Sequence, residues 1–405
     1  MNDFFRRFAG MPRRDFLTHA GAGLLGAGVA AATARAADAD PADAPFAVVH
    51  GPVVQSPGTG EVTVTWHTNR PATAAVRCAV DGGEERVFVT SRDGLIPNDS
   101  TSHAVRVTGL APGKPFTYTL VSREFKGYRT PYEVTHGETL TSGPFTCTPT
   151  DPAERPFSFI MWNDIHDKGK LLASMFDDTD WDDVDFVVLN GDIINDCITE
   201  QQAFRAFYDV CAARFGASLP LVFVRGNHET RGPWARRLRE VVPGRGGEYY
   251  YSFPHGGAHF VVLDSGEDKP DGNKEYAGLV EFGSFRERQT RWLEADLASE
   301  AAKAARWKIL LTHQPPAFEP DDGFGMREVR RLWQPLAEAA GARLWLSGHT
   351  HSFSWVRPGG AGGKTFHTVV NPPDATLRVD VRPEALRVTV TQHGGKRLHE
   401  EEIPA

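Results

Sequence analysis

The pattern of hydrophobic and polar positions changes close to residue 150. Between about residues 46 and 150, apolar and polar side chains alternate in short runs, as they do from Val62 to Trp66, and glycine and proline separate the runs. This period of two predicts half-buried strands, and their close spacing favours an antiparallel β-sandwich. After residue 150, continuous apolar runs alternate with amphipathic segments, which predicts buried strands and helices in α/β order.

Five apolar runs in the second part of the chain predict strands. They span residues 157–162, 186–189, 221–224, 309–311 and 344–346. Because these runs are short and almost wholly apolar, we expect the strands to be buried on both faces.

The amphipathic segments between these runs predict three helices. Thr199 and Gln202 have the spacing of a capping box, which would open the first helix. The other two are expected from about residue 284 to 297 and from about residue 326 to 341. Near the end of the chain, alternation returns on both sides of Pro383 and predicts a hairpin that closes one sheet.

Each predicted strand is followed by a side chain of a type that binds metals. These side chains are Asp164, His166, Asp192, Asn227, His313, His349 and His351. One such residue at a strand end is commonly a turn former or a cap. Five strand ends of this kind are not explained by packing, and the carboxyl ends of strands are where open α/β sheets hold ligands. The pattern therefore predicts a metal site.

The order of these motifs resembles the calcineurin-like metallophosphoesterase superfamily over about residues 155–375. The resemblance implies an α/β fold, a four-layer α+β β-sandwich flanked by helices, that hydrolyses phosphoric esters at two metal ions. It assigns one ion to Asp164, His166, Asp192 and His351, and the other to Asp192, Asn227, His313 and His349, with Asp192 as the bridge. Carboxylates and imidazoles without thiolates suit divalent or trivalent Mn, Fe or Zn.

The resemblance also implies that a hydroxide held between the ions attacks phosphorus, and that His228 donates a proton to the leaving oxygen. Asp196 and Glu229 both remain candidates for the carboxylate that orients His228. Purple acid phosphatases carry a metal-binding tyrosine three residues after the bridging aspartate, whereas this chain has Asn195. The resemblance therefore does not imply that this chain binds the same metals as purple acid phosphatases.

The first part of the chain carries a looser resemblance. The segment from Gly51 to Gln55 resembles the first strand of the N-terminal domain of purple acid phosphatases, and Tyr118 looks like the tyrosine of fibronectin type III domains. We therefore expect an all-β, fibronectin type III-like sandwich over residues 46–150, followed by a catalytic domain over residues 151–405.

The start of the chain is similar to a bacterial export signal. Residues 1–36 contain the pair Arg13 and Arg14, then an apolar stretch and a small-residue cleavage site, and residues 37–45 form a lead-in. The apolar stretch is short and rich in glycine, which argues against a stable membrane anchor. The sequence thus predicts passage through the twin-arginine export machinery to the periplasm or the medium.

Charge and cysteine content narrow the function further. The formal net charge is −8, and acidic residues at 319, 321 and 322 follow His313, so a polyanion such as nucleic acid is a poor partner. A small phosphomonoester is the expected substrate, with a phosphodiester as the alternative and a non-catalytic metal-binding protein as a remote one. Two disulfides, Cys78–Cys147 and Cys197–Cys211, or four buried thiols are both compatible with the spacing.

Overall fold

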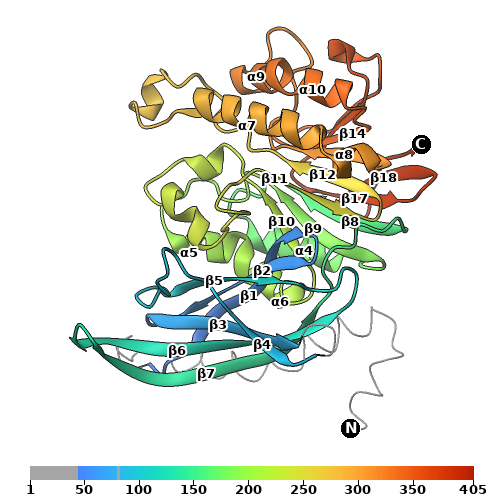
Figure 1. Cartoon of the computed structure of the whole chain (residues 1–405). Helices are drawn as coiled ribbons and strands as arrows, with labels where there is room; N and C mark the ends of the chain where they lie inside the picture. Colours follow the sequence, from blue (N-terminus) through green and yellow to red (C-terminus); the bar gives the residue numbers. More distant parts are fainter. Residues whose placement is uncertain (1–43, 80–82) are drawn as a thin grey trace.

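The computed structural model describes residues 44–79 and 83–405, and the chain folds into sheets covered by helices (Figure 1). The signal predicted for residues 1–36 lies outside the described residues, so export stays a prediction. Within the described residues, no helix is both long enough and apolar enough to span a bilayer.

Two large sheets form the centre of the described part of the chain. The first has nine strands in the spatial order β19 (Arg397–Pro404), β18 (Ala385–Gln392), β17 (Ala375–Val381), β8 (Phe157–Trp162), β9 (Val184–Asn190), β10 (Leu221–Val224), β1 (Val48–Gly58), β2 (Glu61–Thr68) and β5 (Ser102–Thr108). The second has six in the order β11 (Tyr251–His255), β12 (Ala258–Val262), β13 (Trp307–Leu311), β14 (Leu344–Ser347), β16 (His367–Val370) and β15 (Ser354–Val356).

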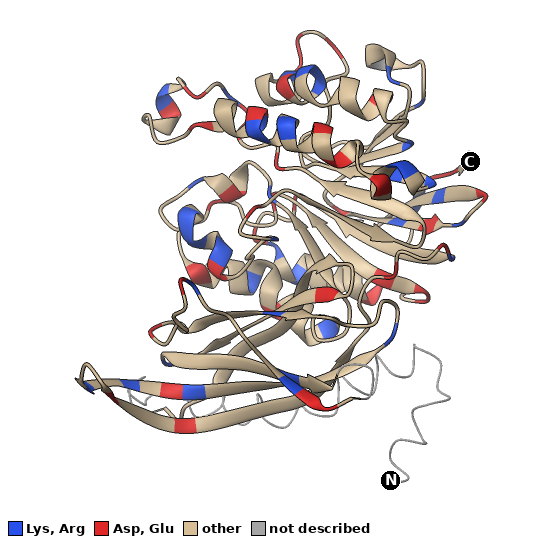
Figure 2. Ribbon diagram, viewed as in Figure 1, with Lys and Arg blue, Asp and Glu red and all other residues tan. Residues whose placement is uncertain are grey.

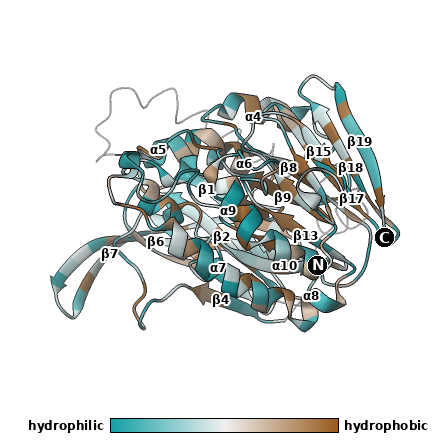
Figure 3. Ribbon diagram, turned by 90° about the horizontal axis from the view of Figure 1, so that it is seen from above, coloured by the Kyte–Doolittle hydropathy of each residue, from teal (hydrophilic) through white to brown (hydrophobic). Residues whose placement is uncertain are grey.

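The two sheets face each other across a shared apolar core. Phe159 and Phe186 of the first sheet are stacked with ring centroids 5.0 Å apart, and Phe260 of the second sheet meets Phe159 edge-on at 5.3 Å. All three side chains are fully buried. Figure 3 shows this centre as hydrophobic strands and β19, at the edge, as largely hydrophilic. The core explains why the predicted runs are apolar on both faces.

Helices cover the outer faces of both sheets. Against the nine-stranded sheet pack α4 (Gly169–Asp177), α5 (Glu200–Ala203), the π-helical η1 (Phe204–Tyr208), α6 (Asp209–Arg214) and η3 (Ala235–Glu240). Against the six-stranded sheet pack α7 (Phe282–Leu297), α9 (Phe324–Leu332) and α10 (Gln334–Ala339). Shorter helices are η2 (His228–Thr230), η4 (Lys274–Tyr276), α8 (Glu300–Ala304) and η5 (Ala361–Gly363). The helix–sheet–sheet–helix order confirms the expected four-layer fold.

Some predicted elements differ in detail. The capping box is present, with the Gln202 side chain accepting the N–H of Thr199. The third predicted helix is split into α9 and α10 at Trp333, because Pro335 at the start of α10 has no N–H to continue the ladder. The predicted hairpin is β17–β18, and β19 extends it.

The N-terminal strands form a sandwich that shares a sheet with the second part of the chain. A four-stranded sheet, in the order β4 (Glu85–Val89), β3 (Ala72–Ala79), β6 (Phe116–Thr130) and β7 (Glu133–Cys147), faces β1, β2 and β5 across a core that includes Trp66. Strand β1 also pairs in parallel with β10, at Gln55 and Leu221. The likeness to fibronectin type III domains and the boundary near residue 150 stay predictions.

Side chains reinforce this junction. The Gln55 amide donates to the carbonyl of Val241 at 2.8 Å. The hydroxyl of Tyr118, the residue that resembles the tyrosine of fibronectin type III domains, donates to the carbonyl of Ala217 at 2.9 Å. The N-terminal strands and the following fold are therefore joined by both backbone and side-chain bonds.

All four cysteines are buried free thiols: Cys78, Cys147, Cys197 and Cys211. Of the two alternatives left open by their spacing, the structure supports the one without disulfides.

Candidate metal centre

The carboxyl ends of strands from both sheets converge on one set of side chains. Strands β8, β9 and β10 run parallel in the first sheet, and β13 and β14 run parallel in the second. The loops that follow these five strands carry every residue predicted to bind metal. Because the sheets face each other, the loops from both lie at a common edge.

The first group of potential ligands consists of Asp164, His166 and His351. Nε2 of His351 lies 3.2 Å from Oδ1 of Asp164, and the Nε2 atoms of His166 and His351 are 3.1 Å apart. Three ligand atoms within this reach are suited to one ion.

The second group consists of Asp192, His313 and His349. Nε2 of His313 is 3.0 Å from Oδ2 of Asp192 and 3.8 Å from Oδ1 of Asp164, so it stands between the carboxylates of the two groups. These two groups divide the aspartates and histidines as the resemblance implies, while the bridging role of Asp192 and the place of Asn227 in the second set stay predictions.

One potential ligand atom at this edge is buried with no partner among the described residues, namely Oδ1 of Asn227. Nε2 of His313 and Oδ1 of Asp164 are equally buried and have only the contacts with other potential ligands given above. Buried polar groups are rarely left unsatisfied, because desolvation costs about 1–3 kcal/mol for each. Oxygen and imidazole nitrogen are suitable donors for Mn, Fe or Zn, so the residues present fit the ions that the resemblance implies.

The protonation of this cluster also indicates a place for cations. Burial alone would lower the pKa of His313, but the carboxylates of Asp192 and Asp164 outweigh burial and raise its pKa to about 10. Burial alone would raise the pKa of Asp192, but the neighbouring His313 and His228 hold it well below its usual range. The two aspartates therefore favour positive charge between them.

Unusual backbone conformations concentrate here. Of the ten non-glycine residues with positive φ in the described part of the chain, five are potential ligands: Asp164, His166, Asp192, His349 and His351. Left-handed conformations cost free energy in residues with a Cβ atom and tend to persist where function requires them. A Cβ atom on Gly226 would lie 2.3 Å from Oδ1 of Asp192, so the loops can approach only because this residue is glycine.

Glu229 organises the loops through their backbone N–H groups. Its buried carboxylate accepts backbone N–H bonds from Asp192, Ile193, Ile194 and Gly226 at 2.7–2.9 Å. It therefore ties the loop after β9 to the loop after β10. This role removes Glu229 from the two candidates for orienting His228.

The group that orients His228 is a backbone carbonyl. Nδ1 of His228 donates to the carbonyl of Asn195 at 2.5 Å, whereas the Asp196 carboxylate accepts from the Asn195 amide. The side-chain oxygen of Asn195 lies 3.2 Å from Nδ1 of His166. Asn195 thus positions both histidines and leaves their Nε2 atoms facing the cluster.

One acidic residue in the loop after His313 stabilises the conformation of the loop itself. The Asp322 carboxylate accepts the backbone N–H groups of Phe318 and Glu319 at 2.6 and 2.9 Å. Glu319 and Asp321 are exposed. Their expected position at the mouth of the site stays a prediction.

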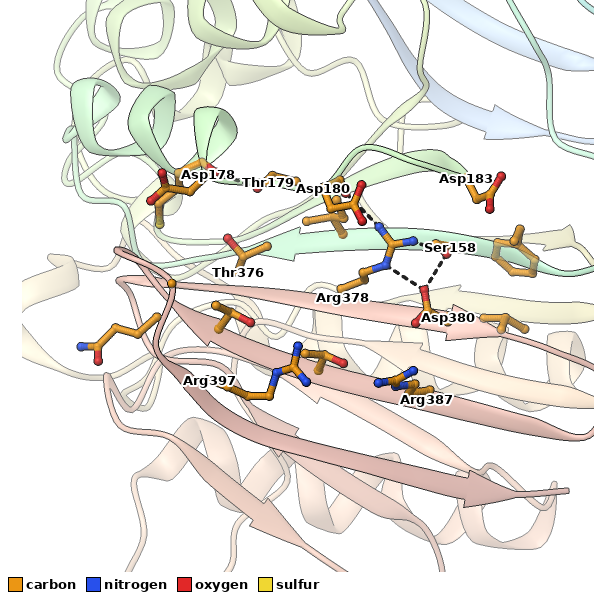
Figure 4. A pocket seen from close by; sticks show the side chains of 18 of the residues that line it. Ser158, Asp178, Thr179, Asp180, Asp183, Thr376, Arg378, Asp380, Arg387 and Arg397 are labelled. Atoms are coloured by element: carbon orange, nitrogen blue, oxygen red, sulfur yellow. Dashed lines mark hydrogen bonds and ion pairs between the residues drawn. The ribbon is translucent and has the colours of Figure 1, made fainter. Parts of the chain in front are cut away.

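A cavity of about 560 Å³ lies at the opposite end of β8 from the metal-type residues. It is bounded by the end of α4 and by strands β8, β17 and β18, and several of its charged groups are in ion pairs, such as Arg378 with Asp380 at 2.7 Å (Figure 4). Elsewhere, basic and acidic residues are interspersed over the ribbon (Figure 2). The candidate site is therefore the strand-end cluster.

Comparisons with known proteins agree with this location. The family described as calcineurin-like phosphoesterase matches residues 157–353. An acid phosphatase of Aspergillus ficuum is 27% identical over 159 residues, which are 32% of this chain and 26% of the relative. The serine/threonine-protein phosphatase CPPED1 of Mus musculus is 30% identical over 175 residues, 41% of this chain and 53% of the relative. The chain thus spans at most about half the length of these curated relatives.

Longer alignments involve plant proteins. Purple acid phosphatase 18 of Arabidopsis thaliana is 23% identical over 305 residues, 67% of this chain and 63% of the relative. The structure of purple acid phosphatase PPD1 from yellow lupin superposes with a TM-score of 0.63 at 16% identity, covering 87% of this chain and 74% of that one, which establishes a common fold. Together with the converging strand ends, these matches show that residues 157–353 form a calcineurin-like phosphoesterase domain.

Proposed function

We propose that the protein is an exported phosphoric ester hydrolase that holds two metal ions and acts on small phosphomonoesters. The observation that carries this proposal is that two groups of potential ligands lie together around two buried carboxylates, with the buried Oδ1 of Asn227 beside them left without a partner among the described residues. Asp164, His166, Asp192 and His351 would hold one ion, and Asp192, Asn227, His313 and His349 the other. When bound, such ions act as Lewis acids and lower the pKa of a water molecule held between them.

The chain's own residues would position these parts. Asn163 donates to Oδ2 of Asp164 at 2.6 Å, and Nδ1 of His313 bonds the carbonyl of Asn190 at 2.8 Å. These bonds fix the orientation of the carboxylate and the tautomer of the imidazole. His228, which is partly exposed and 3.9 Å from Oδ2 of Asp192, would serve the leaving oxygen.

Two features support a small monoester. The formal charge of −8 repels polyanions at long range, and the exposed Glu319 and Asp321 lie in the loop that follows His313. The export proposal is supported by the arginine pair at residues 13 and 14 and the apolar stretch after it.

The test is hydrolysis of nitrophenyl phosphate and of its bis-nitrophenyl diester by metal-depleted protein and by the same protein reloaded with Mn. We expect turnover only after reloading, with a larger kcat/KM for the monoester. A preference for the diester would make the protein a phosphodiesterase. Binding of metal without turnover of either ester would indicate that the protein binds metal but is not a catalyst.

A further inference from the structure

Arg231 stands beside His228 on the short η2 turn. Its backbone N–H donates to the carbonyl of His228 at 3.2 Å, which closes the turn and places both side chains on one side of it. Nη1 of Arg231 lies 3.0 Å from Nε2 of His228. This nitrogen is the one on which the proposed role of His228 depends.

A buried carboxylate fixes the plane of the guanidinium. Glu267, whose side chain is 1% exposed, accepts from Nε and Nη2 of Arg231 at 3.0 and 2.9 Å. Glu267 is itself held by the hydroxyls of Thr230 and Tyr276 at 2.8 and 3.0 Å. Asp268 adds a weaker contact to Nη2 at 3.4 Å. The carboxylates of Glu267 and Asp268 thus bind the Nε and Nη2 side of the guanidinium and leave Nη1 directed at His228.

The Nη1 side of the Arg231 guanidinium is accessible to solvent. The Arg231 side chain is 26% exposed and that of His228 is 24% exposed. An arginine presents five N–H groups in a rigid plane, and no more than a part of these can be satisfied by Glu267 and His228. Because Nδ1 of His228 donates to the carbonyl of Asn195, Nε2 of His228 accepts one N–H of Nη1, and the second N–H of Nη1 remains for an oxygen of a phosphoryl group.

We propose that Arg231 is a substrate-binding residue whose Nη1 edge holds a non-bridging oxygen of the phosphoryl group next to the oxygen served by His228. This inference rests on the proposed function, and it deepens it by naming a residue that selects monoesters. A phosphomonoester has three non-bridging oxygens, so one would remain for Arg231 if the bound ions took up the other two. A diester carries a second ester arm in place of that third oxygen and cannot offer the same charged acceptor.

The competing interpretation is that Arg231 only pairs with Glu267 to hold the loop. Arg231→Lys separates the two roles, because lysine keeps the charge and can pair with Glu267 but lacks the second arm that reaches His228. Arg231→Gln removes the charge altogether. Arg237→Lys is the matched control, since Arg237 forms a similar two-bond pair with Glu240 at 2.8 Å but is 62% exposed.

The experiment measures metal content, the affinity of the Mn-loaded proteins for inorganic phosphate by calorimetry, and kcat/KM for the monoester and the diester. We expect Arg231→Lys and Arg231→Gln to keep their metals, to bind phosphate about 10- to 100-fold more weakly, and to lose monoester activity by a similar factor with less effect on the diester. The Arg237→Lys control should match the wild type in each measurement.

The outcomes separate the inference from the proposed function. Unchanged phosphate affinity and an unchanged monoester-to-diester ratio in Arg231→Lys would overturn the role of Arg231 while hydrolysis by the wild type still stood. A wild type that binds phosphate through Arg231 but hydrolyses neither ester would support the binding role and refute the hydrolase. A wild type that neither binds phosphate nor hydrolyses an ester would refute both.

Discussion

Asp192 belongs to the second ligand group, and the resemblance implies that it also bridges to the first. Its Oδ2 faces His313, its Oδ1 accepts the backbone N–H of His228 at 2.9 Å, and its backbone has a positive φ of 53°. An aspartate held this way has little freedom to reorient, so a change in its charge alters the site directly. The lowered pKa of the Asp192 carboxyl, caused chiefly by His313 and His228 against the effect of burial, shows how strongly its surroundings favour the anion.

We predict that Asp192→Asn lowers the occupancy of both metal ions, because it removes a negative charge shared by both groups. Elemental analysis after Mn or Fe loading measures the occupancy. Asp183→Asn is the control, since Asp183 also has positive φ but is exposed and outside the cluster. Loss of one ion alone from Asp192→Asn would argue against the bridge.

His228→Ala should keep the metals and lower turnover by about 10²–10⁴-fold, the usual contribution of a general acid–base group. The loss should shrink for esters with very good leaving groups, which need little protonation. Measuring kcat over a series of aryl phosphates tests this. An equal loss across the series would indicate that His228 binds or positions substrate instead.

Gly226→Ala should disrupt the cluster from the backbone. The added Cβ atom would lie 2.3 Å from Oδ1 and 2.4 Å from the backbone nitrogen of Asp192, and overpacking of this kind typically costs about 1–3 kcal/mol. We expect a lower Tm and reduced metal content. Gly272→Ala is the control, because a Cβ atom there meets nothing within 4 Å; equal behaviour of the two variants would contradict the argument.

At the residue scale, the sequence identified side chains that act directly and missed groups that act through the backbone. The seven potential ligands stand out because Asp, Asn and His follow apolar runs. The carbonyl of Asn195 and the N–H groups around Glu229 could not be predicted, since every residue carries a carbonyl and an N–H. Arg231 was missed because its partner Glu267 is distant in sequence.

At the scale of elements, apolar runs predicted the strands that lie between the two sheets. Strands β8 and β10 have the bounds expected, and β9, β13 and β14 extend one to three residues beyond the predicted runs. Strands β11, β12, β15 and β16 of the second sheet were not predicted; β11 contains Pro254, and the three residues of β15 are only half buried. Their pairing depends on neighbours that a local pattern does not reveal.

The contact between β2, β5 and the helices after β9 should make the fold sensitive to acid. Burial, with the nearby His50 and His103, lowers the pKa of His67 to about 3, and burial lowers that of His103 to about 4. Both histidines are then neutral in the folded state and ionise near pH 6.5 once unfolded. The unfolded state binds more protons below pH 6.5, so stability must fall as the pH drops from about 6.5 toward 4.

We expect the free energy of unfolding to be lower by roughly 2–3 kcal/mol for each of these histidines at pH 4.5 than at neutral pH. Urea unfolding at several pH values measures this. The His67→Gln variant should show a shallower loss than the wild type, and the control His136→Gln, on the β6–β7 hairpin, should not. Parallel pH curves for all three proteins would exclude a contribution from His67.

At the scale of the whole molecule, the shared sheet makes the two halves of the chain interdependent. Strand β10 is paired with β9 on one side and with β1 on the other, and all four of its residues are buried. The sequence could not predict this, because Gln55 and Leu221 lie far apart in the chain and the ladder between them is short.

A fragment of residues 151–405 should therefore associate with itself, because removing β1 leaves an apolar edge strand without a partner. Light scattering and size-exclusion chromatography of this fragment, compared with residues 44–405, test the prediction. A monomeric fragment with full metal content would show that the N-terminal strands are dispensable.

The same sheet sets an order of events during synthesis. Strand β1 leaves the ribosome well before β10 exists, so its outer edge stays open until the parallel partner has been made. If the chain crossed a membrane unfolded, the open edge of β1 would be able to pair with other chains until the crossing was complete. If the protein is exported as proposed, a route that carries folded proteins would let this edge close before the chain crosses the membrane.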